Sequence, residues 1–409
     1  MVAVLDTLRK SCAGHAREGE DSDAVVGARP AYVAAPGDTS ETADVMRAAV
    51  EHGLRVVPRG AATKLDWGGA PDAVDLVVDT SRMDTVVEHV AGDLVVHVQA
   101  GVTLAALGDR LAGSGQRLAL DPPFPAATIG GTVATGTSGP LRLLYGGPRD
   151  LVIGTTIVRA DGVVARSGGK VVKNVAGYDL GKLLTGSFGT LGVLTECVLR
   201  CHPRPPARRW LLRECGSADA AAEVVRSVRR SQLSPSALEV DRPDRGGPLS
   251  VAVLLEGTGE GVAGRVAGLA EDGWVEDGPP AWWGEHPVVR DGTAVKITFA
   301  MSALGPVLAA VDELAPPATV VRGQAGSGVL TLGLPPEADA AGVAGLVTGL
   351  RGFVPSYDGV VVVLHAPPAV RAALGDVWGP VKGLELMRRV KEQFDPGRRL
   401  APGRFVGGI

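Results

Sequence analysis

The chain has 409 residues, 45% apolar and 21% charged, which is long enough for two domains and too apolar for a disordered or collagen-like protein. Its 41 basic and 45 acidic residues give a net charge of −4, and only 4% of the residues are aromatic. These values, without any long basic run, argue against a nucleic-acid-binding protein.

The first half of the chain predicts short strands with few helices between them. Residues 1–28 are polar and of mixed charge, and we expect an irregular or helical lead-in. A helix is predicted at 39–53, with Thr39 or Ser40 as its N-cap, and another at 102–115. Runs of β-branched residues predict strands at 54–58, 75–81, 84–90, 93–101, 150–161, 163–167 and 191–201. Because strands and helices do not alternate regularly, this half is α+β.

The second half begins with HPRPPARRW (202–210), whose prolines predict a linker. Helices are then predicted at 218–230, 262–271 and 303–314, and strands at 250–256, 294–300, 319–322, 328–335 and 360–366. This pattern predicts a compact α+β cap domain. A last helix at 381–394 is ended by Asp-Pro-Gly and is followed by the tail RRLAPGRF.

The segment PRGAATKLDWGG (58–69) directly follows a predicted strand. A turn at Pro-Arg-Gly exposes successive main-chain N–H groups, and such a nest of N–H groups can hold a pyrophosphate. The small residues Gly60, Ala61 and Ala62 let a ligand approach the main chain. An ordinary tight turn is an equally good interpretation of this segment taken alone.

A second glycine-rich segment, DPPFPAATIGGTVATGTSG (121–139), supplies small groups and hydroxyls that suit a flat ring system and a phosphate chain. A flexible linker is the alternative interpretation. It fits poorly, because Ile129 and Val133 are placed to anchor the segment in a core.

Other glycine patterns are less informative. The segment 173–196 imitates a Walker A loop, but Ala176 stands where that loop needs glycine. Gly259, Gly261 and Gly264 satisfy the dinucleotide-binding pattern GxGxxG. The run around Glu276 is too short for the second strand of a βαβ unit, so we interpret this pattern as an ordinary connection.

No metal site is predicted. Cys12, Cys197, Cys201 and Cys215 fit neither zinc nor iron–sulfur spacing, and we interpret them as reduced structural thiols of a cytosolic protein. The seven histidines include no pair at metal-binding spacing. We also expect no signal peptide and no membrane span, so the chain by itself is predicted to be soluble.

The glycine segments, taken together and in this order, resemble the FAD-binding domain of the vanillyl-alcohol oxidase and p-cresol methylhydroxylase (PCMH) superfamily. The resemblance lies in PRG…TK at 58–64, ATIGGTVATGTSG at 127–139 and GYDLGKLLTGSFGTLGVLTE at 177–196. The ending FDPGRRLAPGRF (394–405) resembles the C-terminal return of this fold over its flavin. TKLDWG, KNVAGYDL and the modest size of the cap are similar to the smaller flavin subunit of bacterial glycolate oxidases.

The resemblance implies an α+β protein with a two-subdomain PCMH-type FAD-binding domain. The implied parts are the lead-in at 1–28, the FAD-binding domain at 29–203, an α+β cap or substrate domain at 204–375, and a C-terminal helix and tail at 376–409 that return to the FAD-binding domain.

The resemblance also implies which residues hold FAD. Residues 58–64 would hold its pyrophosphate through main-chain N–H groups, the second segment would line the diphosphate and isoalloxazine, and the third would lie near the adenosine and ribitol. The residues implied are Pro58, Arg59, Gly60, Ala61, Ala62, Thr63, Lys64, Thr128, Gly130, Gly131, Thr135, Ser138, Gly139, Gly189, Thr190, Gly192 and Val193.

Three alanines depart from the pattern of related sequences. Those sequences favour glycine where this chain has Ala61 and Ala62, and asparagine where it has Ala401. An alanine costs access at a position that needs a positive φ. His89 and His97 occupy no obvious flavin-linking position, so we expect the FAD to be bound non-covalently.

A flavin that oxidises a 2-hydroxy acid needs a base for the hydroxyl proton and a cation for the carboxylate. Lys296, Arg322 and His365 lie on predicted cap strands and are candidates, although a surface role on a half-exposed strand is the favoured interpretation of each. No catalytic residue is therefore assigned from the sequence.

The resemblance supports three hypotheses. The first is the FAD-binding subunit of a glycolate oxidase or dehydrogenase complex, which converts glycolate into glyoxylate together with a larger flavin subunit and an iron–sulfur subunit. We expect it in the cytoplasm, with any membrane association made through those partners. The second is a stand-alone FAD oxidoreductase for another small hydroxy acid such as lactate. The third is an assembly subunit whose flavin pocket is vestigial.

Overall fold

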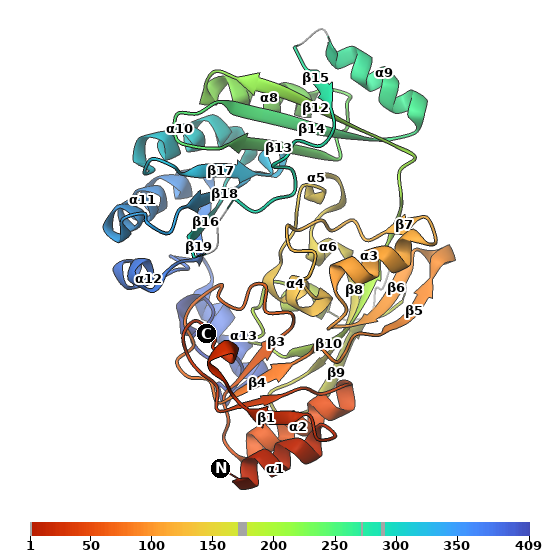
Figure 1. Cartoon of the computed structure of the whole chain (residues 1–409), viewed down its shortest axis with the longest axis vertical. Helices are drawn as coiled ribbons and strands as arrows, with labels where there is room; N and C mark the ends of the chain where they lie inside the picture. The colour runs from red at the N-terminus through yellow and green to blue at the C-terminus, as the bar shows by residue number, and fades with distance from the viewer. Residues whose placement is uncertain (1, 171–177, 271–272, 288–290) are drawn as a thin grey trace.

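The computed structural model describes residues 2–170, 178–270, 273–287 and 291–409. Its N-terminal part forms two subdomains, a cap lies above them, and the last helix returns to the base (Figure 1). Within the described ranges, no helix is long and apolar enough to cross a membrane.

The first subdomain is a four-stranded sheet with two helices packed on it. The strands lie in the order β1-β2-β4-β3; β2, β4 and β3 are parallel, and β1 is antiparallel to β2. Its elements are α1 Val2–Ser11, β1 Ala16–Glu18, β2 Tyr32–Ala34, α2 Thr39–Glu51, β3 Val56–Arg59 and β4 Leu76–Asp79. Leu8 of α1 lies in the same core as Met46 of α2 and Leu76 of β4. Residues 2–28 therefore pack with this subdomain rather than forming a separate lead-in.

The N-cap of α2 differs from the prediction. It is Asp38, whose extended backbone lets its carboxylate accept the N–H of Glu41, so neither Thr39 nor Ser40 takes this role.

The second subdomain is a five-stranded antiparallel sheet in the order β5-β6-β10-β8-β9. Its strands are β5 Val86–Val90, β6 Val95–Gln99, β8 Val152–Val158, β9 Val164–Gly168 and β10 Val193–Arg200, with the small pair β7 Gln116–Arg117 and β11 His202–Pro203. Its helices are α3 Leu104–Ala112, α4 Ile129–Thr135, α5 Arg142–Tyr145, α6 Pro148–Leu151 and α7 Leu180–Leu184.

Part of the glycine-rich segment 127–139 is the helix α4. Ile129 and Val133 are buried in the core of the second subdomain, which confirms that they anchor the segment. Gly130 packs against Ala100, where a Cβ would approach the Cβ of that residue to 2.8 Å. The missing side chain therefore lets the helix lie close to the end of β6.

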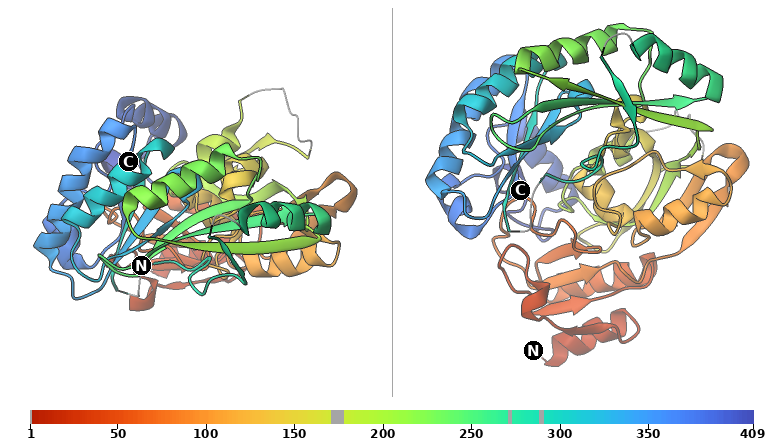
Figure 2. Two further views of the ribbon diagram at one scale, coloured as in Figure 1. Left: turned by 90° about the horizontal axis from the view of Figure 1, so that it is seen from above. Right: turned by 45° about the horizontal axis from the view of Figure 1, so that its top comes forward.

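The cap is an eight-stranded sheet in the order β15-β12-β14-β13-β17-β18-β16-β19, with every neighbouring pair antiparallel. Its strands are β12 Ala207–Cys215, β13 Ala237–Arg242, β14 Leu249–Gly257, β15 Val275–Asp277, β16 Thr293–Thr298, β17 Val320–Gly323, β18 Val329–Leu334 and β19 Val360–His365. Its helices are α8 Ala218–Arg230, α9 Gly259–Ala270, α10 Leu304–Leu314, α11 Ala340–Phe353 and α12 Pro368–Leu374. The helices pack on the outer face of this sheet and form the largest core with it (Figures 1 and 2).

In the cap, one sequence interpretation changes and another holds. Strand β12 begins inside the proline-rich segment 202–210, so only residues 204–206 remain between β11 and β12. The GxGxxG pattern lies at the start of α9, and the strand that follows, β15, pairs antiparallel with β12. Because β14 is also antiparallel to β12, β14 and β15 are parallel but separated by β12. The split unit β14-α9-β15 lacks the adjacent parallel strands of a dinucleotide-binding fold, in agreement with our interpretation of the pattern as a connection.

Helix α13, Leu384–Phe394, brings the end of the chain back to the two subdomains (Figure 1). Val390 and Phe394 pack on the core of the second subdomain, and Leu400 lies in the core of the first. Leu400 also forms a parallel bridge to Val56 of β3. The C-terminal tail is therefore joined directly to the strand that precedes the predicted pyrophosphate turn.

Candidate functional site

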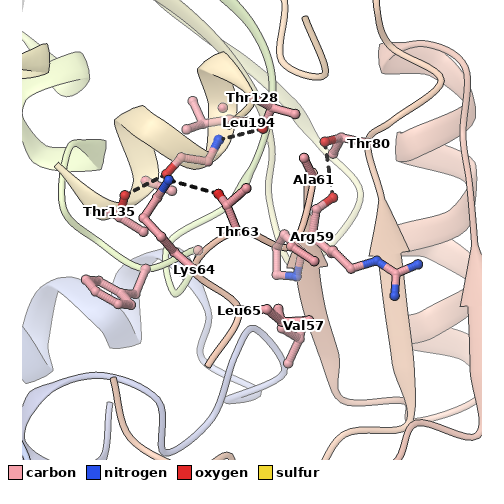
Figure 3. Close-up of a pocket in the computed structure, with 18 of the residues that line it drawn as sticks. Val57, Arg59, Ala61, Thr63, Lys64, Leu65, Thr80, Thr128, Thr135 and Leu194 are labelled. Atoms are coloured by element: carbon pink, nitrogen blue, oxygen red, sulfur yellow. Dashed lines mark hydrogen bonds between the residues drawn. The ribbon is translucent and has the colours of Figure 1, made fainter. Parts of the chain in front are cut away.

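A cleft with an empty volume of about 800 Å³ lies between the turn after β3, helix α4, the segment before β10 and Arg404; we call it the first cleft (Figure 3). It is lined by most of the residues that the resemblance to the PCMH superfamily implied for FAD binding. Those lining it are Pro58, Arg59, Gly60, Ala61, Ala62, Thr63, Lys64, Thr128, Gly130, Gly131, Thr135, Gly189 and Gly192.

The turn after β3 offers a row of free main-chain donors to this cleft. Within the described part of the chain, none of the N–H groups of residues 60–64 donates a hydrogen bond. Successive unpartnered N–H groups in a turn suit the oxygens of a phosphate or pyrophosphate. The structure thus contains the donors that a nest requires.

The guanidinium of Arg59 is used inside the protein. It donates to Asp79 at 2.6 and 3.1 Å and to Asp23 at 2.7 Å. Figure 3 shows it directed away from Thr63 and Lys64. Hydrogen bonds from Arg17 and Arg59 also hold the pKa of the buried Asp23 well below its usual range. Arg59 therefore fixes the position of the turn, and its contribution to the cleft lies in the main chain.

Two buried cations line the first cleft. The Nζ of Lys64, a residue 7% exposed, donates to Thr63 Oγ1 at 3.1 Å and lies 4.9 Å from the centre of the Phe124 ring. Arg404, 3% exposed, donates from Nη2 to Trp67 O at 2.8 Å, and its buried Nη1 has no hydrogen-bond partner among the described residues. Burial lowers the pKa of Lys64 to about 8 and that of Arg404 to about 10, so both are largely charged at pH 7. Buried cations without a carboxylate partner indicate an anionic ligand.

Two of the unusual alanines have the backbone conformation that favours glycine. Ala62 has a φ of 57° and Ala401 a φ of 45°, whereas Ala61 has no positive φ. An alanine in this region costs about 1 kcal/mol. Of the two neighbouring alanines, Ala61 and Ala62, only Ala62 therefore has a strained backbone.

We expect the replacement of Gly60 by alanine to destabilise the protein by about 1–3 kcal/mol and to weaken flavin binding at least tenfold. A Cβ at position 60 would lie 2.1 Å from Thr128 Oγ1, and that oxygen accepts the N–H of Gly131 as the cap of α4. Urea unfolding and flavin titration measure both effects. Gly92→Ala is the matched control, because nothing lies within 4 Å of a Cβ there. Equal free energies of unfolding and equal flavin affinities of Gly60→Ala and Gly92→Ala would contradict this expectation.

A larger cleft of about 1490 Å³ lies between the inner face of the cap sheet and the FAD-binding half; we call it the second cleft. Thr135 and Phe188 line both clefts, and the predicted residues Ser138 and Gly139 line the second. Only glycine fits at position 139, because a Cβ would lie 1.8 Å from Asp121 O. Thr190 and Val193 line neither described cleft; both are buried, and Thr190 Oγ1 donates to Ser187 O.

The cap brings Lys296 and Arg322 to the second cleft. Both face Thr331 of the central strand β18, Lys296 from β16 and Arg322 from β17, so all three share the inner face of the sheet. Lys296 has no hydrogen-bond or ion-pair partner in the described ranges, and burial together with Arg142 lowers its pKa to about 8. Arg322 donates to Asp241 at 2.6 Å and to Glu285 O at 3.3 Å.

The third candidate, His365, does not line either cleft. Its Nδ1 lies 2.7 Å from a carboxylate oxygen of Asp66. A bulge between β16 and β19 lies next to this end of the strand. His365 therefore joins the cap to the segment that follows the pyrophosphate turn.

The other end of the second cleft is apolar. Strand β19 contributes Val360, Val362 and Leu364 to the wall. Beside them, the ring of Trp378 lies 4.9 Å from Phe188 and 5.0 Å from Phe405, in edge-to-face contacts. The cleft thus has a charged region over β13, β17 and β16 and an apolar region over β19 and the C-terminal tail.

Sequence reasoning missed three residues of the clefts, Arg404, His286 and Glu239. His286 lies 5.2 Å from Phe124 between ring centres, and burial, with a contribution from Arg322, lowers its pKa to about 4. Glu239 lies in a strand whose six residues are all buried. The sequence could have indicated Glu239, because it is a carboxylate within the apolar run SALEV. For Arg404, the only indication in the sequence was its position in the C-terminal tail.

The described residues contain no group of three or more His, Cys, Asp or Glu side chains that could hold a metal ion. The four cysteines are free and buried. His89 contacts Gln116 and His97 contacts Glu196, and neither histidine lines a cleft. Residues 173–177 of the KNVAGYDL motif lie outside the described residues.

Two families match the sequence. One, described as FAD binding domain, matches residues 30–168, and the other, the C-terminal domain of FAD linked oxidases, matches residues 369–405. Among solved structures, an alkyldihydroxyacetonephosphate synthase superposes with a TM-score of 0.70 at 18% identity and covers 93% of this chain and 78% of its own. At that identity the likeness concerns the fold.

Three relatives are similar over part of the chain. Glycolate oxidase subunit GlcD of Bacillus subtilis (strain 168) is 36% identical over 216 residues, which are 52% of this chain and 46% of GlcD. Glycolate oxidase subunit GlcE of Escherichia coli (strain K12) is 43% identical over 141 residues, 34% of this chain and 40% of GlcE. D-lactate dehydrogenase of Archaeoglobus fulgidus is 35% identical over 207 residues, 51% of this chain and 46% of that enzyme. The matched region thus spans less than half the length of each of these relatives.

Proposed function

We propose that this chain oxidises a 2-hydroxy acid to the corresponding 2-oxo acid, because residues 30–168 match the FAD binding domain, residues 369–405 match the C-terminal domain of FAD linked oxidases, and the fold is of the PCMH type. The observation that carries the proposal is the unpartnered Lys296, which shares one face of the cap sheet with Arg322 in a cleft that adjoins the cofactor site. When bound, FAD supplies a two-electron acceptor for the hydride from the C2 atom of the substrate.

The first cleft fits the cofactor. The free N–H groups of residues 60–64 would hold phosphate oxygens, and Lys64 and Arg404 would offset negative charge of the cofactor. No protein carboxylate pairs with either cation in the described part of the chain, so an anionic ligand would be their counter-charge. Non-covalent binding follows from the positions of His89 and His97, which contact glutamine and glutamate away from both clefts.

Lys296 and Arg322 would hold the carboxylate of the substrate. They lie on strands that flank β18, at about twice the strand spacing of roughly 4.8 Å from each other, so long side chains can converge on one small anion. Phe188, Trp378 and Phe405 would exclude water from the reacting carbon.

The similarity to two glycolate oxidase subunits supports glycolate as substrate and glyoxylate as product. It also supports a role as a flavin subunit of a glycolate oxidase complex, with a larger flavin subunit and an iron–sulfur subunit as partners. We propose a cytoplasmic location, with any membrane association made through those partners.

A stand-alone oxidoreductase for lactate or a larger hydroxy acid is the second candidate. The apolar end of the second cleft would accommodate a side chain that glycolate lacks, and the similarity to a D-lactate dehydrogenase points the same way. The third hypothesis, an assembly subunit with a vestigial flavin pocket, is less well supported. In such a protein no ligand would supply a counter-charge to Lys296 or Arg404.

Anaerobic mixing of the purified chain with a panel of hydroxy acids tests the proposal. We expect a flavin absorbance band that bleaches with glycolate, or with D-lactate or a larger hydroxy acid. Bleaching and dye turnover by the single chain with lactate support the stand-alone enzyme, whereas turnover of glycolate that needs partner subunits supports the complex. A flavin band that no 2-hydroxy acid bleaches, with or without partners, would show that the proposed reaction is wrong.

Replacement of Lys296 by glutamine is expected to raise the KM for the hydroxy acid about 10–100-fold and to change kcat little, because a charge-assisted hydrogen bond is worth about 1.5–3 kcal/mol. Since the pKa of Lys296 is about 8, its positive charge is present below that pH and is lost above it. The KM of the unmodified enzyme should therefore rise above pH 8, and that of the variant should not. Lys182→Gln, in an exposed ion pair with Asp179, is the control. A KM that is independent of pH in the unmodified enzyme would contradict the assignment.

A further inference from the structure

Glu239 is a buried acid in the wall of the second cleft. It lies on β13 and is 3% exposed, and its Oε1 is buried without a hydrogen-bond partner in the described residues. Side chains two positions apart on a strand share one face, so Glu239 lies on the same inner face as Asp241, which is paired in register with Arg322. Glu239 therefore borders the charged region of the cleft that would receive the carboxylate.

Few groups compensate the charge of this carboxyl. Burial raises the pKa of Glu239 well above its usual value, and the carboxylate of Asp121 raises it further. Arg322 of the neighbouring strand β17 and a hydrogen bond from Gln324, which directly follows that strand, act in the opposite direction. Arg142 of the adjacent α5 also lines the cleft, but no ion pair joins Glu239 to a cation in the described ranges.

Asp121 belongs to the FAD-binding half and is held in place by its main-chain contacts. Its two carboxylate oxygens accept the N–H of Leu141 at 3.0 and 3.2 Å. Gly139 packs directly on its carbonyl oxygen. Burial raises the pKa of Asp121 to about 7. Two acids with raised pKa values, one from each half of the protein, therefore meet behind the wall of the cleft, an arrangement found where proton transfer occurs.

We propose that Glu239 accepts the hydroxyl proton of the substrate and that Asp121, which Leu141 and Gly139 hold behind the wall of the cleft, is a positioning residue for Glu239. The inference rests on the 2-hydroxy-acid oxidation proposed above. In this step the O–H bond breaks and its proton passes to Glu239, while the O–H electron pair forms the C=O bond at C2. Bound FAD would accept the C2 hydrogen with its electron pair, and the 2-oxo acid would remain. The hydroxyl is on the carbon next to the carboxylate, which accords with a base beside the carboxylate-binding residues.

Glu239→Gln keeps the size of the side chain and removes the base. We expect kcat to fall about 100-fold or more, because general base catalysis contributes about 10²–10⁴-fold, with KM and FAD content little changed. Glu239→Asp should retain part of the activity. A Glu239 that only donates a hydrogen bond to the substrate carboxylate could be replaced by the amide, so a wild-type kcat in Glu239→Gln would overturn the proposal.

The pH profile gives a second readout. Since Glu239 must lose its proton to act as a base, kcat/KM of the unmodified enzyme should rise with pH, and this rise should be absent in Glu239→Gln. Asp121→Asn should move the rise to lower pH, because it removes a negative charge that raises the pKa of Glu239. A profile that is the same in all three proteins would overturn the proposal.

A measurement that does not depend on turnover completes the test. Infrared difference spectroscopy across a pH titration of the folded, FAD-loaded chain should show carbonyl bands of protonated carboxylic acids near neutral pH, one from Glu239 and one from Asp121. Glu239→Gln should lose the first band and keep the second, and Asp121→Asn should do the reverse. Absence of the Glu239 band in the unmodified protein would also overturn the proposal. If no hydroxy acid reduces the unmodified enzyme, the proposed function fails and this inference fails with it. If one does and Glu239→Gln is reduced equally fast, only this inference fails.

Discussion

Replacement of Lys391 by methionine is expected to lower the free energy of unfolding by about 3–5 kcal/mol, because it leaves an uncompensated charge in the interior. The Nζ of Lys391 donates to Asp395 at 2.7 Å, to Thr190 O at 2.8 Å and to Leu400 O at 2.7 Å, so all three of its protons are used. The Lys391 side chain is only 4% exposed and that of Asp395 1%. Methionine would fill the space and leave the carboxylate and both carbonyls without this donor.

The matched control lies on the same helix. Arg388 pairs with Glu385 at the surface of α13, three residues apart, and exposed pairs of this kind contribute about 0–1 kcal/mol. Chemical denaturation of Arg388→Met should thus resemble that of the unmodified protein. Equal stability of the two variants would show that the contacts of Lys391 do not hold the C-terminal tail to the FAD-binding half.

Replacement of Arg404 by methionine is expected to weaken FAD binding about 100-fold or more without destabilising the protein in the absence of FAD. The buried guanidinium has one carbonyl partner, Trp67 O, and a free Nη1 that lines the first cleft. Replacing a buried charge without an ion-pair partner by an apolar side chain is often neutral or stabilising. The melting temperature without FAD should stay the same or rise, and the increase on adding FAD should shrink.

Arg371 is the matched control for Arg404. It donates to Gly68 O, Asp66 O and Ala366 O, and it does not line the first cleft. Arg371→Met should therefore lower stability and leave FAD affinity nearly unchanged, the reverse of Arg404→Met. If Arg404→Met binds FAD as tightly as the unmodified protein, the cofactor does not supply the counter-charge of this arginine.

Local patterns in the sequence predicted the elements whose signals are local. The helix at 218–230 was predicted with the bounds that α8 has, since its N-cap Ser217 and its alternating apolar and charged residues are all contained in one segment. The resemblance of the three glycine segments to the PCMH superfamily, rather than a local pattern alone, implied most of the residues that line the first cleft. The small residues of these segments are needed for close contacts, such as that of Gly60 with Thr128, that no other residue allows.

What the sequence could not show depends on contacts between distant segments. Strand β13 reads ALEVDR, and Glu239 is buried only because loop 119–123 and α5 of the FAD-binding half pack against that strand. Arg59 was expected near the cofactor, but its guanidinium is taken by Asp23, from a segment that composition alone made an irregular lead-in. Asp38 is the N-cap of α2 because its backbone is extended. The sequence alone could not distinguish Asp38 from Thr39 and Ser40, which are also good N-cap residues.

The contact between Asp23 and Arg59 bears on the smallest unit that we expect to bind the flavin. The strand before the pyrophosphate turn is held on one side by a residue from the start of the chain and on the other by Leu400 from its end. Neither a fragment that begins at residue 29 nor one that stops before α13 would retain both supports. We therefore expect cofactor binding to depend on both ends of the polypeptide together, and the intervening cap to be exchanged more readily than either terminus can be removed.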